Sequence, residues 1–184
     1  MNYIEIMVEE HRNIKRMLTV IRKYCYKVLR NEDLNYEDFF AIIEFVRNYA
    51  DKHHHGKEEK LLFDKMMTEM GTIAEKLVKH GMLVEHDLGR LHIQQLEAAV
   101  HKVIGGYDEA RLDVIANAIS YTDLLHRHID KEDNVIFHFA QKNLTKEVQE
   151  TLEQDCTLFE EAACADNIQK KYLDMIAEFE EKFR

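Results

Sequence analysis

The feature that most constrains the fold of this chain is the absence of proline from all 184 residues. Proline ends or kinks helices, because its ring lacks a backbone N–H and clashes with the preceding turn. Leu, Ile, Met, Lys and Glu are abundant, and only six glycines are present. Since helix formers dominate the composition, we predict an all-α protein. A chain of this length can bury a real core within one domain.

Apolar residues recur along the chain at the spacing of helix turns, and short groups of Asn, Asp or Gly separate the resulting segments. The predicted helices cover about 2–30, 36–70, 72–104 and 108–142. One more helical region follows, with a break near 163–167. Because short joints favour antiparallel neighbours, we predict an up-down-up-down four-helix bundle. It is formed by residues 1–142, and a C-terminal helical extension, 143–184, packs on it.

Composition and charge argue against several partners. The chain has 25 basic and 35 acidic residues, a net charge of −10, and no basic run that could follow a nucleic acid. No segment approaches the roughly 20 apolar residues of a membrane span, and the charged N-terminus does not read as a signal peptide. Cys25, Cys156 and Cys164 are odd in number and form no C-x-x-C pair. We therefore expect a cytoplasmic protein without a disulfide framework.

Two segments, which start 74 residues apart, share the frame H-x-x-K-E-[ED]-x-[LV]-[LI]-F. The first contains His54 and Glu58, and the second contains His128 and Glu132. A spacing of four residues places both side chains of each pair on the same helix face. Imidazole and carboxylate together suit iron, manganese or zinc, and two such pairs on facing helices can bridge two ions.

The first and third predicted helices each add an inward histidine that follows a glutamate. These are His11, which lies 43 residues before His54, and His86, which lies 42 residues before His128. The chain therefore resembles two copies of one unit, and predicts a dinuclear site of four histidines and two bridging carboxylates. A lone core histidine is more often structural, and a lone H-x-x-x-E pair is commonly solvated. Burying all six without a cation would be costly, which favours the metal site.

The pattern H … H-x-x-x-E … H … H-x-x-x-E resembles the hemerythrin-like, or HHE cation-binding, proteins over about residues 4–142. The segments "HHGKEEKLLF", "EHDLGR" and "HIDKEDNVIF" carry the resemblance. It implies a non-haem di-iron centre with a bridging oxo or hydroxo group. The implied ligands are His11, His54, Glu58, His86, His128 and Glu132. The resemblance also implies interaction with O2, peroxide or nitric oxide, iron sensing, or repair of iron centres.

Two departures from the family pattern narrow these functions. Oxygen-carrying hemerythrins have an H-x-x-x-H pair on the third helix, whereas Met82 stands four residues before His86 here. This difference disfavours reversible oxygen carriage. The repair proteins of the family add an N-terminal segment that bears a cysteine, and this chain starts almost at its first helix. We therefore expect a function other than repair.

Several other residues could complete the site. His55 points about 100° away from His54 around the helix, and whether it reaches the second ion is left open. His53 and His126 are expected at the helix flank or beside the ligands. Surface positions are expected for His80, His92, His101 and His138.

Three further residues on the helix faces of the predicted ligands could each have either a structural or a functional role. They are Arg90, Tyr121 and Gly89. Arg90 could form a salt bridge with Glu85 or a ligand glutamate, or could lie near the open coordination positions. Tyr121 could donate a hydrogen bond to a bound oxygen species, or could simply be core. Gly89 permits close approach to the site or close helix packing.

The first functional hypothesis is a di-iron protein that binds O2 or peroxide and reacts with it, whether or not as a true enzyme. It predicts oxidation of the reduced form by peroxide faster than by air. The alternative is a module that binds or senses iron, oxygen or nitric oxide without turnover, with the C-terminal helix facing a partner. Metal storage or a structural zinc site is weaker, because structural zinc favours thiolate-rich sites. A homodimer fits either hypothesis, and the electron donor is open.

Overall fold

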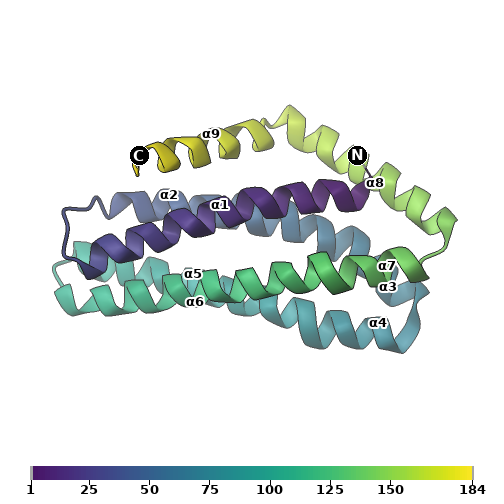
Figure 1. The fold of residues 1–184 in the computed structure, drawn as a ribbon, viewed down its shortest axis with the longest axis horizontal. Helices are drawn as coiled ribbons and strands as arrows, with labels where there is room; N and C mark the ends of the chain where they lie inside the picture. Colours follow the sequence, from purple (N-terminus) through teal and green to yellow (C-terminus); the bar gives the residue numbers. More distant parts are fainter. Residues whose placement is uncertain (1, 184) are drawn as a thin grey trace.

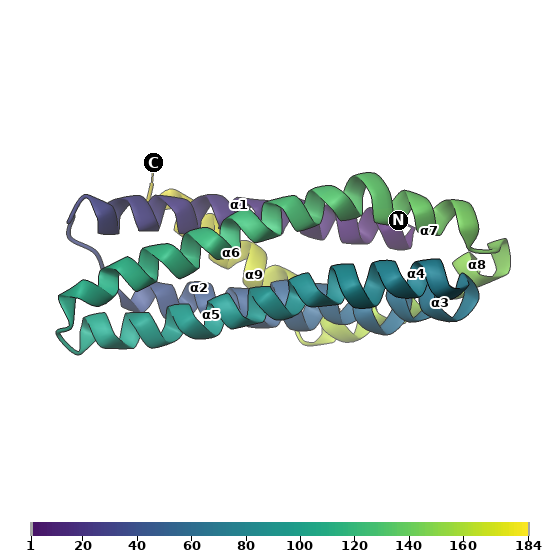
Figure 2. The ribbon, with the colours of Figure 1, turned by 90° about the horizontal axis from the view of Figure 1, so that it is seen from below.

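The computed structural model describes residues 2–183 and contains no strand in that range. Four long helical segments, the bundle helices, run alternately up and down, and the C-terminal residues cross one side of them (Figure 1). Figure 2 shows the same antiparallel arrangement from below. The all-α up-down-up-down bundle predicted from the sequence is therefore confirmed.

Each bundle helix after the first is built from several elements. The first bundle helix is α1 (Tyr3–Leu29), and the second joins α2 (Glu37–Phe45), η1 (Val46–His55), η2 (Glu58–Leu62) and α3 (Phe63–Glu69). The third joins α4 (Gly71–Leu77), η3 (Val78–Met82) and α5 (Leu83–Ile104). The fourth joins η4 (Asp108–Ala110), α6 (Arg111–Lys131), η5 (Glu132–Ile136) and α7 (Phe137–Asn143). The extension consists of α8 (Lys146–Ala165) and α9 (Ile168–Glu181).

Local chemistry accounts for the ends of the helices. Asn2 caps α1, because its side chain accepts from the backbone of Glu5 while the Glu5 side chain accepts from the backbone of Asn2. Thr145 caps α8, because its side chain accepts from the backbone N–H of Val148. Asn167, at φ 55°, takes the left-handed conformation that separates α8 from α9. The predicted break near 163–167 is thereby confirmed, whereas the domain boundary at 142/143 stays a prediction.

Two apolar clusters lie at opposite ends of the bundle, and α8 and α9 each cover one of them. Tyr172, Ile176 and Phe179 of α9 pack into the larger cluster, which is formed mainly by α1, α2, α5 and α6. Leu152 and Cys156 of α8 pack into the smaller cluster, which contains parts of α1, α3, α4 and α7. Buried polar side chains occupy the level between the two clusters. The polar centre of the bundle therefore lies between two apolar ends.

The bundle helices depart from regular α-helix at four places, η1, η2, η3 and η5, where the turns are π-helical. The N–H of Gly56 bonds the carbonyl of Asp51, and that of Phe137 bonds the carbonyl of Glu132, both five residues back. Wide turns of this kind are frequent at functional sites. Three of the six predicted ligands, His54, Glu58 and Glu132, lie in these turns, whereas the other three lie in regular α-helix.

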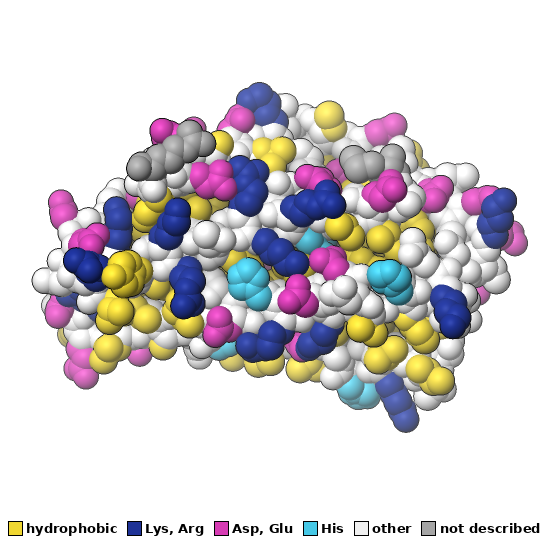
Figure 3. Space-filling view, viewed as in Figure 1, with side chains coloured by type: hydrophobic (Ala, Val, Ile, Leu, Met, Phe, Trp, Pro, Cys, Tyr) yellow, Lys and Arg dark blue, Asp and Glu magenta, His cyan; other side chains and the backbone are white. Residues whose placement is uncertain are grey.

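In the part of the chain that the structure describes, no helix is long and apolar enough to cross a membrane. The face drawn in Figure 3 mixes Lys and Arg with Asp and Glu, and exposed histidines lie among them. It shows no continuous basic surface.

Candidate metal centre

The six residues predicted as ligands converge between the four bundle helices, and all six are buried. Together with His55 they form two groups, and the donor atoms within each group lie within 4.8 Å of one another. One group consists of His11, His54, Glu58 and Glu132, and the other of His55, Glu58, His86 and His128. Each bundle helix contributes at least one residue to the centre. Packing of the bundle therefore brings together candidate ligands that are spread over 122 sequence positions, from 11 to 132.

The two glutamates lie between the imidazoles. Oε2 of Glu132 is 3.3 Å from Nε2 of His11 and 3.2 Å from Nε2 of His128. Glu58 has Oε1 3.5 Å from Nε2 of His54, and Oε2 3.7 Å from Nε2 of His86. Each carboxylate thus faces histidines of both groups. This is the arrangement that two bridging carboxylates need.

The structure adds His55, which the sequence left open. Its ring stacks on that of His86, with centroids 3.8 Å apart and planes within 8°. In the second copy of the frame this position is Ile129, so the centre is not symmetric. Met82 is buried in an apolar cluster and supplies no nitrogen or oxygen donor. The fifth imidazole therefore comes from the second bundle helix, rather than from the third-helix position where the oxygen carriers have theirs.

All five imidazoles have a carboxylate at Nδ1, a feature that the sequence reasoning missed. The nitrogen-to-oxygen distances are 2.6 Å for His11 and Asp133, 2.8 Å for His54 and Glu10, 3.4 Å for His55 and Asp51, 2.7 Å for His86 and Glu59, and 2.9 Å for His128 and Glu85. A carboxylate at Nδ1 fixes the ring and its tautomer, so that Nε2 is free to bind a metal. The outer carboxylates therefore aim the imidazoles into the centre.

These outer contacts follow the sequence duplication. Glu10, just before His11, lies at Nδ1 of His54, and Glu85, just before His86, lies at Nδ1 of His128. The acidic residues that follow Glu58 and Glu132 in the sequence contact the histidines of the opposite copy: Glu59 lies at Nδ1 of His86 and Asp133 at Nδ1 of His11.

The last residue of the frame has the same role in both copies. Phe137 stacks on His11 at 5.5 Å, and Phe63 lies over His86 at 6.0 Å. The frame thus encodes ligands, outer carboxylates and ring packing together. The repeated glutamates beside the ligands were a signal that could have predicted the outer carboxylates.

Several buried polar atoms of the centre have no hydrogen-bond partner among the described residues. They are Nε2 of His11 and of His54, and both side-chain oxygens of Glu58 and Glu132. Burial of such atoms costs free energy unless a cation compensates them. Burial and the neighbouring Glu132 raise the pKa of Glu58 well above its ordinary value. A donor set of imidazole and carboxylate without thiolate fits iron, manganese or zinc, so these residues suit a metal pair.

The surroundings of the imidazoles differ in charge. Burial lowers the pKa of His128, but Glu132 and Glu85 outweigh it and raise the value to about 10. Burial and the nearby His11 lower the pKa of His54 to about 4. A hydrogen bond from His128 lowers the pKa of Glu85 to about 2. The outer carboxylates are therefore ionised at neutral pH and supply the negative charge that favours a bound cation.

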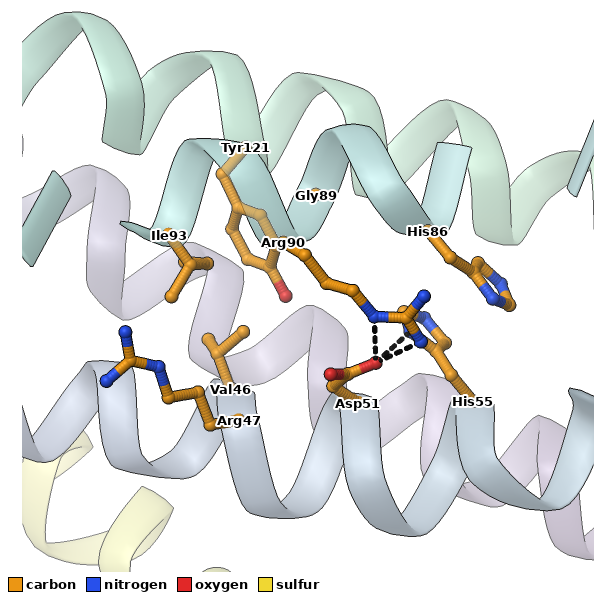
Figure 4. Close-up of a pocket in the computed structure, with 9 residues that line it drawn as sticks. All are labelled: Val46, Arg47, Asp51, His55, His86, Gly89, Arg90, Ile93 and Tyr121. Atoms are coloured by element: carbon orange, nitrogen blue, oxygen red, sulfur yellow. Dashed lines mark hydrogen bonds and ion pairs between the residues drawn. The ribbon is translucent and has the colours of Figure 1, made fainter. Parts of the chain in front are cut away.

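A cavity of about 110 Å³ adjoins the centre on the side of His55 and His86 (Figure 4). The remaining lining residues are Val46, Arg47, Asp51, Gly89, Arg90, Ile93 and Tyr121. The Tyr121 hydroxyl is buried and has no hydrogen-bond partner within the described chain. Its ring packs against Gly89, where an added Cβ would lie 3.6 Å from it. A contact of this length is ordinary, so the packing does not require glycine there, whereas the place of Gly89 in the cavity wall fits the reading that it lies beside the site.

Arg90 closes the side of this cavity. Its guanidinium donates to Asp51 at 2.7 Å and to Glu59 at 2.7 Å, and also bonds Asp87. Of the two readings of Arg90, the salt bridge with Glu85 or a ligand glutamate is not found, because Arg90 pairs with Asp51 and Glu59, the carboxylates at Nδ1 of His55 and His86. Its place in the cavity wall fits the other reading, a polar group near the site.

The other histidines occupy mostly the positions expected. His80, His101, His126 and His138 are exposed. His92 is half-buried rather than on the surface, and its Nδ1 is buried without a partner among the described residues. His53 is buried beside Glu10, the carboxylate that serves His54.

A four-helix bundle that directs histidines and glutamates into its interior defines a class of metal-binding helical proteins. A family model described as the hemerythrin HHE cation binding domain matches residues 2–140. The chain belongs to this family, and the predicted resemblance is confirmed. No curated protein and no solved structure gave a significant match to the chain.

Proposed function

We propose that this chain is a non-haem di-iron protein that binds O2 or peroxide and reduces it. The proposed ligands are His11, His54, Glu58, His86, His128 and Glu132, with His55 as a seventh. The observation that carries the proposal is the set of buried, unpartnered nitrogen and oxygen atoms that face one another at the centre. Sulfur is not among these donors, which favours iron over a structural zinc site.

When bound, two ferrous ions would supply the two electrons that, with two protons, reduce one peroxide molecule to two of water. The chain's own residues hold and shield the site. Glu58 and Glu132 lie where they can bridge, and the outer carboxylates keep each Nε2 directed inward. Phe63 and Phe137 cover two of the imidazoles and exclude water from them.

The cavity supports a small ligand. Its volume of about 110 Å³ is well below the roughly 300–1,000 Å³ of sites for drug-sized molecules. O2, peroxide and nitric oxide fit that size. Burial raises the pKa of Tyr121, so its hydroxyl stays protonated and can donate to a ligand in the cavity.

The test is metal analysis of the purified protein, followed by mixing its reduced form with peroxide and, separately, with O2. We expect two irons per chain and faster oxidation by peroxide than by O2. The change in absorption measures both oxidation rates. Zinc alone, or no iron, would contradict the proposal. We place the reaction in the cytoplasm, where thiols such as the exposed Cys164 stay reduced.

A narrower cavity should slow the reaction without removing the metal. Val46→Phe places a larger ring in the cavity wall, and we expect the peroxide rate to fall at least tenfold, the order of a barrier about 1.4 kcal/mol higher. Stopped-flow absorption at equal metal content measures it. Val46→Ala, which enlarges the same space, is the control and should react at least as fast as the wild type. Equal rates for both variants would show that ligands reach the centre elsewhere.

A second candidate is a module that senses a small ligand such as nitric oxide without turnover. This second function is favoured by a contact between the C-terminal extension and the polar centre. Glu160 of α8 forms an ion pair with Lys57 there. A stable, reversible adduct with no consumption of peroxide would select this function over the first.

A further inference from the structure

The C-terminal pair α8–α9 lies beyond the family match, which ends at residue 140, yet it touches one half of the metal centre. Both helices pack against α1 and the second bundle helix, on the side of the bundle that is uppermost in Figure 1. Glu160 of α8 and Gln169 of α9 enter a buried cluster of polar side chains there. The other members of the cluster are Glu10, His53 and Lys57.

Lys57 is the charge around which this cluster is built. Its side chain is 0% exposed, and lysine is almost never buried without partners. The ammonium contacts Oε1 of Glu10 at 2.5 Å and forms a second ion pair with Glu160. Phe159 lies beside it, with the ammonium 5.5 Å from the ring centroid. Because two carboxylates share one ammonium, loss of either changes the position and charge balance of the other.

Glu10 connects this cluster to the centre. Its Oε2 accepts from Nδ1 of His54 at 2.8 Å. Its Oε1 faces Lys57 and accepts from the amide of Gln169 at 3.2 Å. The same amide donates to Oε2 of Glu160 at 3.1 Å, so the extension holds Glu10 through two side chains.

The other half of the centre lacks this cover. There Glu85 takes the place of Glu10, serves His128, and pairs with Lys131. Lys131 is 47% exposed, whereas the matching Lys57 is fully buried. The duplicated halves therefore differ in their outer surroundings, and the difference is made by the C-terminal pair.

We propose that α8–α9 is a positioning element for one metal: Glu160, with Gln169, fixes Glu10 and through it the ligand His54. The inference rests on the proposed metal centre. It assigns the extension a specific effect on the half built on His11 and His54. Ligand orienters of this kind typically change metal affinity 10- to 100-fold. Glu160 acts one residue further out, so we expect an effect near the lower end.

The experiment is a titration of Co²⁺ into the metal-free full chain, with binding heat and visible absorption recorded together. Glu160→Gln keeps the shape of the side chain and removes its charge. We expect one of two binding steps to weaken about tenfold, with a changed absorption for that step only. Glu161→Gln, the same charge change on an exposed neighbour, should bind like the wild type. Glu160→Asp, which retains the charge, should restore part of the lost affinity.

The outcomes separate the two proposals. A wild-type chain that fails to bind two ions contradicts the metal centre itself. Two normal steps in the wild type with unchanged steps in Glu160→Gln would overturn the positioning role alone. An equal loss at both steps, or a loss that Glu160→Asp does not relieve, would also overturn it, because a general effect on folding would act in that way. An additional readout is the ring N–H resonance of His54 in the metal-free protein. It should exchange faster with water in Glu160→Gln than in Glu161→Gln.

Discussion

We expect removal of the metal from the wild-type protein to lower its melting temperature by roughly 8–16 °C, and Glu58→Gln to remove this difference. The size follows from linkage: a ligand at about 1,000 times its Kd stabilises by about 4 kcal/mol, and each kcal/mol shifts a chain of this size by about 2–4 °C. Glu58 belongs to both ligand groups, so its loss affects both ions. Calorimetry with and without chelator, together with metal analysis, provides the measurement.

The metal-free form of Glu58→Gln should unfold close to metal-free wild type. Burial and Glu132 raise the pKa of Glu58 well above its ordinary value, so the charged form of this side chain is disfavoured in the metal-free chain. A glutamine amide has nearly the same shape and no charge, so its burial costs no more than that of the carboxylate. Glu69→Gln, at an exposed position near the end of α3, is the control and should keep the full chelator response. Retention of two metals by Glu58→Gln would refute the bridging role.

His55→Ile should weaken one of the two metals about 100-fold, a loss of about 2.7 kcal/mol, and leave the other within twofold. Isoleucine is the residue that the second copy of the frame carries at this position, Ile129, where it is buried beside His128. The change therefore gives both halves of the centre the same residue at this position. Isothermal titration with Zn²⁺ or Co²⁺ resolves the two steps.

The control for this variant is His126→Gln, at an exposed position of α6. It also removes a histidine, but we expect both steps to be unchanged. Two unaltered steps in His55→Ile would mean that the stacked ring is packing and not a ligand. A loss of the same size at both steps would indicate that the substitution disturbs the whole centre.

The helices could be predicted from the sequence because their signals are local. Apolar spacing marks the helix faces, and turn residues such as Asn31 and Gly106, at φ 55° and 91°, mark the ends. The wide π-helical turns could not be predicted in that way. Their hydrogen bonds run five residues back, and they depend on how neighbouring helices crowd the polar face.

The same distinction holds within the site. Four candidate ligands could be predicted because the duplicated frame repeats them, and His11 and His86 could be predicted because they precede the two copies at nearly equal intervals. The place of His55 could not, since it depends on the stacking of its ring on His86, which belongs to another helix. The pairing of Glu10 with His54 likewise depends on how α1 packs against η1. Glu160 lies outside the frame, and no local pattern connects it with Lys57.

The wide turns are repeated only in part between the two copies of the frame. η2 and η5 begin at the same position of the frame, at Glu58 and at Glu132, so this turn is common to both copies. η1, in contrast, has no counterpart in the described part of the second copy, where α6 continues to Lys131. It carries His55. The two halves of the centre therefore share the wide turn that starts at the glutamate and differ in the turn before it, so a difference in backbone accompanies the extra imidazole of the first copy.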